Sequence, residues 1–162
     1  MKGGRVMLAV VGLALVLFAM SYGFYYAVWV EHQTLDHIGG ALAGAFQSAA
    51  RGQVNEARAG FDDYARAKYV YTREVDAHSH WGGLGMILLV LAALWDRLSF
   101  GPKGRSLLAG ALVVGCVLFP LGVLLQNYLP SPDGQAVAVA GSALLIVGLV
   151  MVAVGFVKER AL

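Results

Sequence analysis

The chain has 162 residues, of which 59% are hydrophobic and only 14% are charged. Soluble domains carry about a quarter charged residues, so this composition excludes an ordinary soluble fold, and its high hydrophobicity excludes disorder. The formal net charge of +2 indicates no nucleic-acid partner, and the single cysteine, Cys116, excludes an intramolecular disulfide, a cysteine-rich zinc site and C-x-x-C-H attachment of haem.

Four stretches without Asp, Glu, Lys or Arg predict four membrane-spanning helices. A helix needs roughly 20 apolar residues to cross a hydrocarbon core about 30 Å thick. The uncharged stretch 81–95 is shorter than this, so the second span must begin further out and bring His78 and His80 to the membrane boundary. We therefore expect an all-α, integral membrane four-helix bundle that forms a single membrane domain, 1–162. The expected spans are about 6–30, 78–97, 106–128 and 135–157.

The distribution of lysine and arginine predicts the orientation of these spans. Seven basic and two acidic residues lie on the side that holds both termini, whereas five basic and eight acidic residues lie on the other side. Because cytoplasmic segments are enriched in Lys and Arg, both the N- and the C-terminus are expected in the cytoplasm. The expected location is the bacterial inner membrane, with a multi-pass topology and residues 31–77 on the outer side.

Residues 31–77 are the long segment between the first two spans, and their pattern predicts a protruding helical hairpin. Its best turn signal is Arg51-Gly52-Gln53. The downstream arm is expected to form one nearly continuous helix over 53–98, because no proline precedes residue 102. The upstream arm either continues the first span to about residue 50 or breaks at Gly39-Gly40. Apolar residues at helical spacing are expected to face inward on the two arms: Leu35, Ile38 and Leu42 upstream, and Val54, Ala57 and Phe61 downstream.

Small residues predict where the helices approach one another. Gly40 and Gly44 form a G-x-x-x-G pattern that would let the two arms of the hairpin pack closely. Ser131-Pro132-Asp133-Gly134 predicts a tight turn between the last two spans. On the fourth span, a smooth packing face is predicted by three glycines that recur every seven residues: Gly141, Gly148 and Gly155.

All four histidines fall on the predicted outer side: His32, His37, His78 and His80. Histidine is the commonest metal ligand and binds haem iron through a ring nitrogen, so this group predicts a haem or transition-metal site. Tyr25 and Tyr26 lie at a height that matches His78 and are expected to shape its pocket. The alternative is that the histidines at the interface only hydrogen-bond lipid headgroups or tyrosine hydroxyls.

The geometry of a hairpin limits how many histidines can share one site. With the turn in its predicted place, residue i faces residue 104 − i, so His37 lies opposite Ala67 and His78 opposite Tyr26. His37 and His78 then differ in height by about 16 Å, which is too far for one metal ion. A four-histidine site would require a break in the first helix or ligands from another chain. His78 is the inward-facing candidate, whereas His80 is expected to point toward another helix or lipid.

The second span opens with an H-x-H-x-x-x-L-G pattern: His78-Ser79-His80-Trp81-Gly82-Gly83-Leu84-Gly85-Met86. This start resembles that of small uncharacterised bacterial four-helix membrane proteins, which are loosely allied to subunit-I-like proteins of the haem-copper oxidases. The resemblance implies haem or a metal at His78 and His80, on the outer side of the membrane.

Two functions compete. The first is a haem- or metal-binding electron-transfer or accessory subunit that works in the lipid bilayer as a homo-oligomer or as part of a membrane complex. The second is a cofactor-free scaffold or assembly subunit whose outer hairpin docks a partner. Its solvated face would carry five charged residues: Arg58, Asp62, Arg66, Arg73 and Glu74. No H-E-x-x-H, G-x-S-x-G or P-loop motif is present, so no motif predicts an enzyme.

Overall fold

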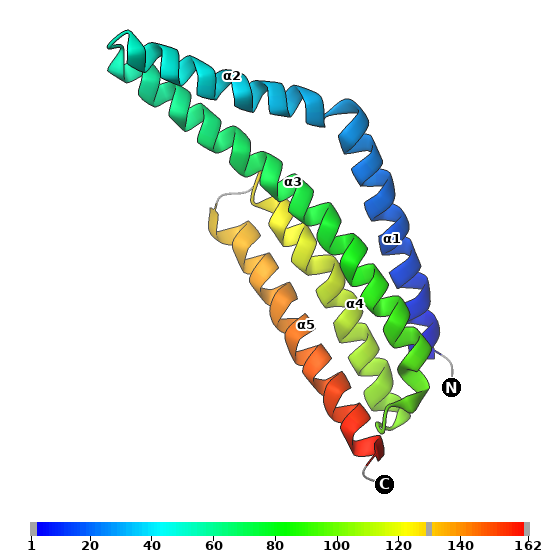
Figure 1. Cartoon of the computed structure of the whole chain (residues 1–162). Helices are drawn as coiled ribbons and strands as arrows, with labels where there is room; N and C mark the ends of the chain where they lie inside the picture. The colour runs from blue at the N-terminus through cyan, green and yellow to red at the C-terminus, as the bar shows by residue number, and fades with distance from the viewer. Residues whose placement is uncertain (1–2, 129–130, 161–162) are drawn as a thin grey trace. The chain divides into compact units, whose positions relative to one another are not determined.

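The computed structural model describes residues 3–128 and 131–160, and the regular structure in these ranges is entirely helical (Figure 1). This confirms the predicted all-α class. The chain divides into two compact units, one made of Met1–Met20 and Asp76–Leu162 and the other of Ser21–Val75. The described ranges hold five α-helices and a short 3-10 helix: α1 Gly3–Trp29, α2 Glu31–Ala50, α3 Val54–Leu94, η1 Trp95–Arg97, α4 Pro102–Leu125 and α5 Ser131–Arg160.

Four helices in the described ranges are long and apolar enough to cross a membrane, as predicted. They are Gly3–Trp29, Val54–Arg97, Pro102–Leu125 and Pro132–Lys158, with mean hydropathy between 1.4 and 2.7 over their most apolar windows. The helix Val54–Arg97 has the lowest of these values, 1.4, and the polar first half of α3 precedes its apolar part.

The tight turn predicted at Ser131-Pro132-Asp133-Gly134 is wrong, because these residues form the first turn of α5. A proline in the first turn loses nothing by lacking an N–H, and its fixed φ suits the start of a helix. Asp133 also lies in this first turn, where a negative charge is favoured by the helix dipole. The same residue types that favour a turn therefore begin a helix here, and the described turn lies earlier, at residues 126–128.

In the unit of Met1–Met20 and Asp76–Leu162, α4 and α5 lie side by side and antiparallel, with glycines at their contact (Figure 1). A methyl group placed on Gly122 would overlap the backbone of Ala138, and one placed on Gly141 would overlap the backbone of Phe119. Residue i of α4 thus faces residue 260 − i of α5. The same register continues at two further contacts: Gly115 with Leu145, and Gly148 with Leu112. The packing face predicted for Gly141 and Gly148 is confirmed.

The third glycine of that repeat, Gly155, contacts the connection before α4 instead of α4 itself. A methyl group on Gly155 would lie 2.9 Å from Leu98 Cδ2 and 2.8 Å from Phe100 Cε2. The Gly155 carbonyl accepts hydrogen bonds from the Ser99 backbone N–H at 3.3 Å and from the Ser99 hydroxyl at 2.9 Å. The C-terminal part of α5 is therefore tied to residues 98–100.

A second glycine contact joins α1 to the C-terminal half of α3 in the same unit. A methyl group placed on Gly12 would lie 2.8 Å from the Gly85 carbonyl oxygen, and one placed on Gly85 would lie 2.8 Å from the Gly12 carbonyl oxygen. Two glycines facing each other let the backbones touch, as small residues do in membrane helices. Leu8 and Leu88, both fully buried, fill the space beside this contact.

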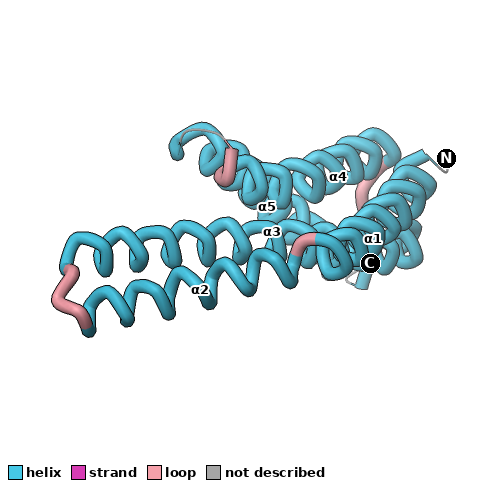
Figure 2. The backbone as a smooth tube through the Cα atoms, turned by 90° about the horizontal axis from the view of Figure 1, so that it is seen from above, coloured by secondary structure: helices cyan, strands magenta, loops and turns pink. Residues whose placement is uncertain are grey.

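In the unit of Ser21–Val75, α2 and the first part of α3 form an antiparallel hairpin closed by residues 51–53 (Figure 2). Gly52 has a φ of +73°, its N–H donates to the Ala49 carbonyl at 3.0 Å, and the Gln53 N–H donates to the Ser48 carbonyl at 2.9 Å. This bonding pattern is the Schellman motif, in which a glycine in the left-handed region ends a helix. The turn predicted at Arg51-Gly52-Gln53 is confirmed.

The downstream arm is one helix of 41 residues, α3, which confirms the continuous helix predicted there. The upstream arm is interrupted at Val30, whereas helix α2 runs unbroken through Gly39-Gly40. The Val30 carbonyl accepts both the Thr34 N–H and the Thr34 hydroxyl, each at 3.1 Å. A hydroxyl that shares a helix carbonyl in this way often bends the helix.

The close approach predicted at Gly40 and Gly44 is wrong. A methyl group placed on either glycine would have no described neighbour within 4 Å. The arms meet instead where Ala45 faces Gly60, because a methyl group on Gly60 would lie 2.9 Å from Ala45 Cβ. Helix α2 turns its alanine face toward α3, so Gly40 and Gly44 fall on the open side.

Candidate functional site

The hairpin histidine His37 pairs with an acidic residue on the opposite arm. Its Nε2 lies 3.1 Å from Asp63 Oδ2, and both side chains are about half exposed. The predicted register placed His37 opposite Ala67, one helical turn away from Asp63. The difference arises because a polar side chain reaches along the neighbouring helix to the group that it can bind.

The four histidines divide between the two units. His32 is exposed on α2, His78 is half-buried on α3, and the ring of His80 lies 4.8 Å from that of Phe119 on α4. The His80 contact confirms the expectation that this side chain points toward another helix. In the ranges 3–128 and 131–160, no three His, Cys, Asp or Glu side chains lie close enough to hold a metal ion. The described residues thus show no histidine cluster, and a haem or metal ligand stays a prediction.

The two tyrosines expected beside His78 have different surroundings. Tyr25 is exposed and stacks on Trp29, with ring centroids 5.7 Å apart. Tyr26 is buried between Tyr22, at 6.4 Å, and Tyr71, at 6.2 Å. Tyr26 therefore belongs to the interior of the hairpin unit, whereas Tyr25 belongs to its surface.

Glu74 is the buried charged residue of the described ranges, with 6% of its surface exposed. Its carboxyl accepts a hydrogen bond from the hydroxyl of Tyr22. The expectation that Glu74 lies on a solvated face is therefore wrong. Burial of a carboxyl is tolerated when it is hydrogen-bonded, and the tyrosine provides that bond. The sequence contains a signal for this, because Glu74 lies three residues after Tyr71 and four before His78, on the face predicted to point inward.

A second carboxyl–tyrosine bond joins the same two arms. The Tyr71 hydroxyl donates to Glu31 Oε1 at 3.0 Å. We call this group the carboxyl–tyrosine cluster; its members are Tyr22, Tyr26, Glu31, Tyr71 and Glu74. Hydrogen bonds to ionised groups are about twice as strong as neutral ones, so two of them fasten the arms firmly. The cluster contains no activated nucleophile, and its chemistry is that of a structural lock.

Large apolar side chains of the hairpin are exposed on both sides of its turn. Phe46 is 60% exposed and Val54 is 74% exposed, and Phe61 packs edge-to-face on Phe46 at 5.5 Å. The expectation that Leu35, Val54 and Phe61 face inward is wrong: all three are exposed, because Ala45, Ala57 and Gly60 occupy the contact between the arms. We call Phe46, Val54 and Phe61 the aromatic tip.

A groove of about 360 Å³ lies further down the hairpin, between the two arms. Its polar lining comes from both helices: Gln33, Thr34 and His37 on α2, and Asp63 and Arg66 on α3. The groove therefore offers donors, acceptors and charges of both signs. The sequence does not predict this groove, because the lining residues come together only when the arms pair.

No protein-family model, curated protein or solved structure matches this chain.

Proposed function

We propose that the chain is a scaffold or assembly subunit of the bacterial inner membrane, whose hairpin docks a partner protein outside the membrane. Both termini lie in the cytoplasm in this proposal, as the seven-to-two excess of basic over acidic residues on their side predicts. The observation that carries the proposal is the exposed aromatic tip at residues 46, 54 and 61.

Exposed apolar side chains require a protein partner in the hairpin but not in the membrane spans. Lipid tails cover apolar residues of the four long helices, and these residues need no partner. The aromatic tip flanks a polar turn, Arg51-Gly52-Gln53, which belongs in water. Apolar groups kept together in water mark interaction surfaces, and aromatic residues dominate the energy of such contacts.

The hairpin is built to keep this tip in one conformation. The Schellman turn at Gly52, the Ala45–Gly60 contact and the Tyr71–Glu31 hydrogen bond each join α2 to α3, and the Tyr22–Glu74 bond joins α1 to α3. A surface that is already ordered loses less conformational entropy on binding, so rigid arms favour docking. The locks have no evident use for a segment that only connects two spans.

The groove sets the chemistry of the partner. His37, Asp63 and Arg66 surround it with both positive and negative groups, which suits a protein surface with mixed hydrogen-bonding groups. A nucleic acid would need a basic surface instead. We infer a partner that places an apolar side chain against Phe46 and Phe61 and polar groups along the groove.

Photo-crosslinking in intact cells tests this proposal. A photoreactive amino acid at Phe46 should give one discrete adduct heavier than the monomer, and the substitution Phe61→Ser should abolish it. The matched control is the same probe at Ala59, an exposed position two residues from Phe61 on α3. An adduct with twice the monomer mass identifies a second copy as the partner. Equal labelling from Phe46 and Ala59, or no adduct from Phe46, contradicts docking through the tip.

A further inference from the structure

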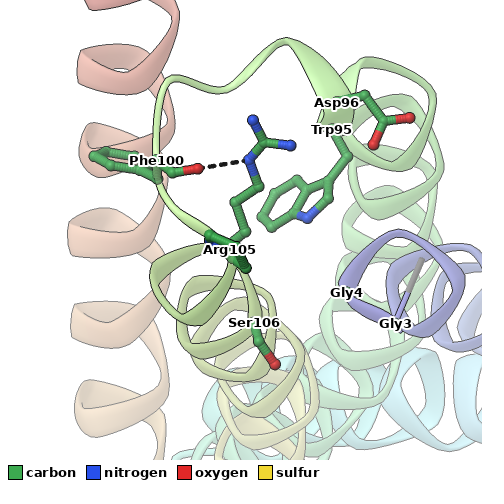
Figure 3. Close-up of a pocket in the computed structure, with 8 residues that line it drawn as sticks. Gly3, Gly4, Trp95, Asp96, Phe100, Arg105 and Ser106 are labelled. Atoms are coloured by element: carbon green, nitrogen blue, oxygen red, sulfur yellow. Dashed lines mark hydrogen bonds between the residues drawn. The ribbon is translucent and has the colours of Figure 1, made fainter. Parts of the chain in front are cut away.

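A polar pocket of about 480 Å³ lies in the unit of Met1–Met20 and Asp76–Leu162, where α1 and α4 begin and α3 ends (Figure 3). It is lined by Gly3 and Gly4 of α1, Trp95 and Asp96 of η1, and Arg105 and Ser106 of α4. The hairpin proposal makes no use of this pocket. Its volume falls in the range of sites that hold small ligands.

The N-terminus of α1 contributes to this pocket through Gly3 and Gly4. The first N–H groups of a helix have no acceptor within the helix, and the helix dipole gives them a partial positive charge. α1 has no acidic residue in its first turn, whereas α4 begins with Pro102, which has no N–H to offer. The start of α1 therefore favours an anion in the pocket.

Arg105 supplies a full positive charge in the same place. Its Nε donates to the Phe100 carbonyl at 2.8 Å, and its Nη2 donates to the Leu98 carbonyl. These bonds hold the guanidinium in the open part of the pocket, as Figure 3 shows. A guanidinium has five N–H donors in a planar fork, so an arginine fastened by two of them still presents donors that match a phosphate.

Trp95 gives independent evidence for a missing acceptor. The residue is 3% exposed, and its Nε1 has no hydrogen-bond partner among the described residues. The indole turns this nitrogen toward the space beside Gly4, where a methyl group would lie 3.0 Å from Nε1 (Figure 3). A buried donor without an acceptor is destabilising, and a ligand oxygen in the pocket would satisfy it.

The one acidic side chain in the lining is already engaged. Asp96 Oδ2 lies 2.9 Å from Arg5 Nη1, and both side chains are more than half exposed. The ion pair leaves the net field of the pocket positive, because Arg105 and the N-terminus of α1 have no acidic partner in the lining.

We propose that this pocket binds a phosphate group, carried by an anionic phospholipid headgroup or present as free phosphate. The phosphate oxygens accept from the indole N–H of Trp95, the guanidinium of Arg105 and the first N–H groups of α1, with the Ser106 hydroxyl beside them. In the orientation proposed above, the pocket lies at the cytoplasmic surface of the membrane, where headgroups of the inner leaflet are within reach. Phosphate binding itself does not depend on that orientation or on docking by the hairpin.

Native mass spectrometry of the delipidated full-length protein in a neutral detergent tests the proposal. Phosphatidylglycerol should give a saturable one-to-one adduct, whereas diacylglycerol, which lacks the phosphate, should give none. Inorganic phosphate that displaces the lipid identifies the free anion as a ligand in its own right. A lipid adduct that phosphate leaves intact identifies the headgroup as the source. Equal binding of diacylglycerol and phosphatidylglycerol would overturn the proposal.

Substitutions assign the adduct to the pocket. Trp95→Phe keeps the ring but removes the N–H and should weaken the lipid adduct about fivefold, as expected for one hydrogen bond. Arg105→Gln should weaken it more than tenfold. Trp81→Phe, a buried tryptophan on α3, and Arg97→Gln, an exposed neighbouring cation, are the controls and should bind like the wild type. Arg105→Gln also leaves two loop carbonyls without their donor, so this variant could unfold. In that case Trp95→Phe decides: if Trp95→Phe binds phosphatidylglycerol as tightly as the wild type, the proposed site is contradicted.

Discussion

At the scale of single residues, the most unusual group is the buried carboxyl of Glu74. A hydrogen bond to an ionised group contributes about 1.5–3 kcal/mol to stability, and a buried group that loses its partner costs about 1–3 kcal/mol. The Tyr22–Glu74 bond therefore stabilises the hairpin unit only while both side chains are present. The pair joins α1 to α3 within the hairpin unit and stabilises the arms on which the aromatic tip depends.

Removal of this carboxyl should destabilise the hairpin. We expect Glu74→Ala to lower the free energy of unfolding by about 2 kcal/mol, because the Tyr22 hydroxyl loses its acceptor. Glu74→Gln keeps an acceptor and should cost less. Thermal unfolding followed by circular dichroism in a mild detergent measures both. Glu56→Ala, at an exposed position on the same helix, is the control, and an equal effect there would rule out the lock.

The histidines give a second test at this scale. The haem or metal prediction for His78 and His80 is tested by a Soret band or by stoichiometric metal in the purified protein. Oxidised and reduced absorption spectra, with metal analysis of the same sample, measure this. A Soret band that His78→Ala abolishes and His80→Ala retains would establish the haem hypothesis and displace the scaffold.

At the scale of helices, the glycines have three different roles. Gly52 ends α2 with a positive φ, Gly141 lets α5 touch α4, and Gly39 lies on an open helix face. A substitution to alanine separates these roles, because the added methyl group meets backbone strain, a backbone overlap or empty space respectively. A loss of stability is expected for the turn and contact glycines, and a gain for the glycine on the open face.

The turn glycine and the helix glycine should respond in opposite directions. Gly52→Ala should destabilise the hairpin by about 1–2 kcal/mol, since an L-residue is strained in the left-handed region. Gly39→Ala should stabilise it by about 0.5–1 kcal/mol, because alanine has less conformational freedom to lose in a helix. Denaturation midpoints in detergent compare the two. A loss of stability in both would show that Gly39 faces a neighbour.

The α4–α5 contact predicts a similar contrast within the bundle. Gly141→Ala should cost about 1–3 kcal/mol, because the helices must separate to admit the methyl group beside Phe119. Gly110 on α4 has no described neighbour within 4 Å, so Gly110→Ala, like Gly39→Ala, should stabilise by about 0.5–1 kcal/mol. Thermal unfolding measures both variants. Equal effects would contradict the 260 − i register.

At the scale of the whole molecule, the basic residues are concentrated on the side of the spans that holds both termini. Seven basic and two acidic residues lie near the termini and in the 96–105 segment, whose side faces the cytoplasm in the proposed topology, whereas residues 31–77 hold five basic and seven acidic residues. The phosphate pocket and the aromatic tip then belong to opposite sides of the membrane in the proposed topology.

Cysteine labelling from outside the cell tests this topology. Gln53→Cys at the hairpin turn should react with a membrane-impermeant maleimide in intact cells, whereas Lys103→Cys should react only after permeabilisation. The native Cys116 is 1% exposed and should not contribute a background. The reverse labelling pattern would place the hairpin in the cytoplasm and remove the outer docking site.

Several features follow from the sequence because they depend on local or periodic properties. The length of each uncharged stretch determines the four apolar helices, and the absence of proline before residue 102 permits the 41-residue α3. The helix ends at Gly52 because glycine alone takes a positive φ without strain. The repeat at Gly141 and Gly148 predicts a packing face, since a spacing of seven places both on one side of a helix.

Other features depended on which face each helix turns toward its neighbour, and only the tertiary structure decided them. Periodicity places Glu74 on the inward face of α3, but its charge led to its assignment to the solvated face, and only the tertiary structure shows the Tyr22 hydroxyl that binds it. Gly40 and Ala45 are both small, yet only Ala45 lies against α3. The pocket at Trp95 joins residues 3–4 to residues 95–106, a distance along the chain that no local pattern can report. Contacts of this kind arise from pairs of surfaces, whereas a sequence pattern describes one surface at a time.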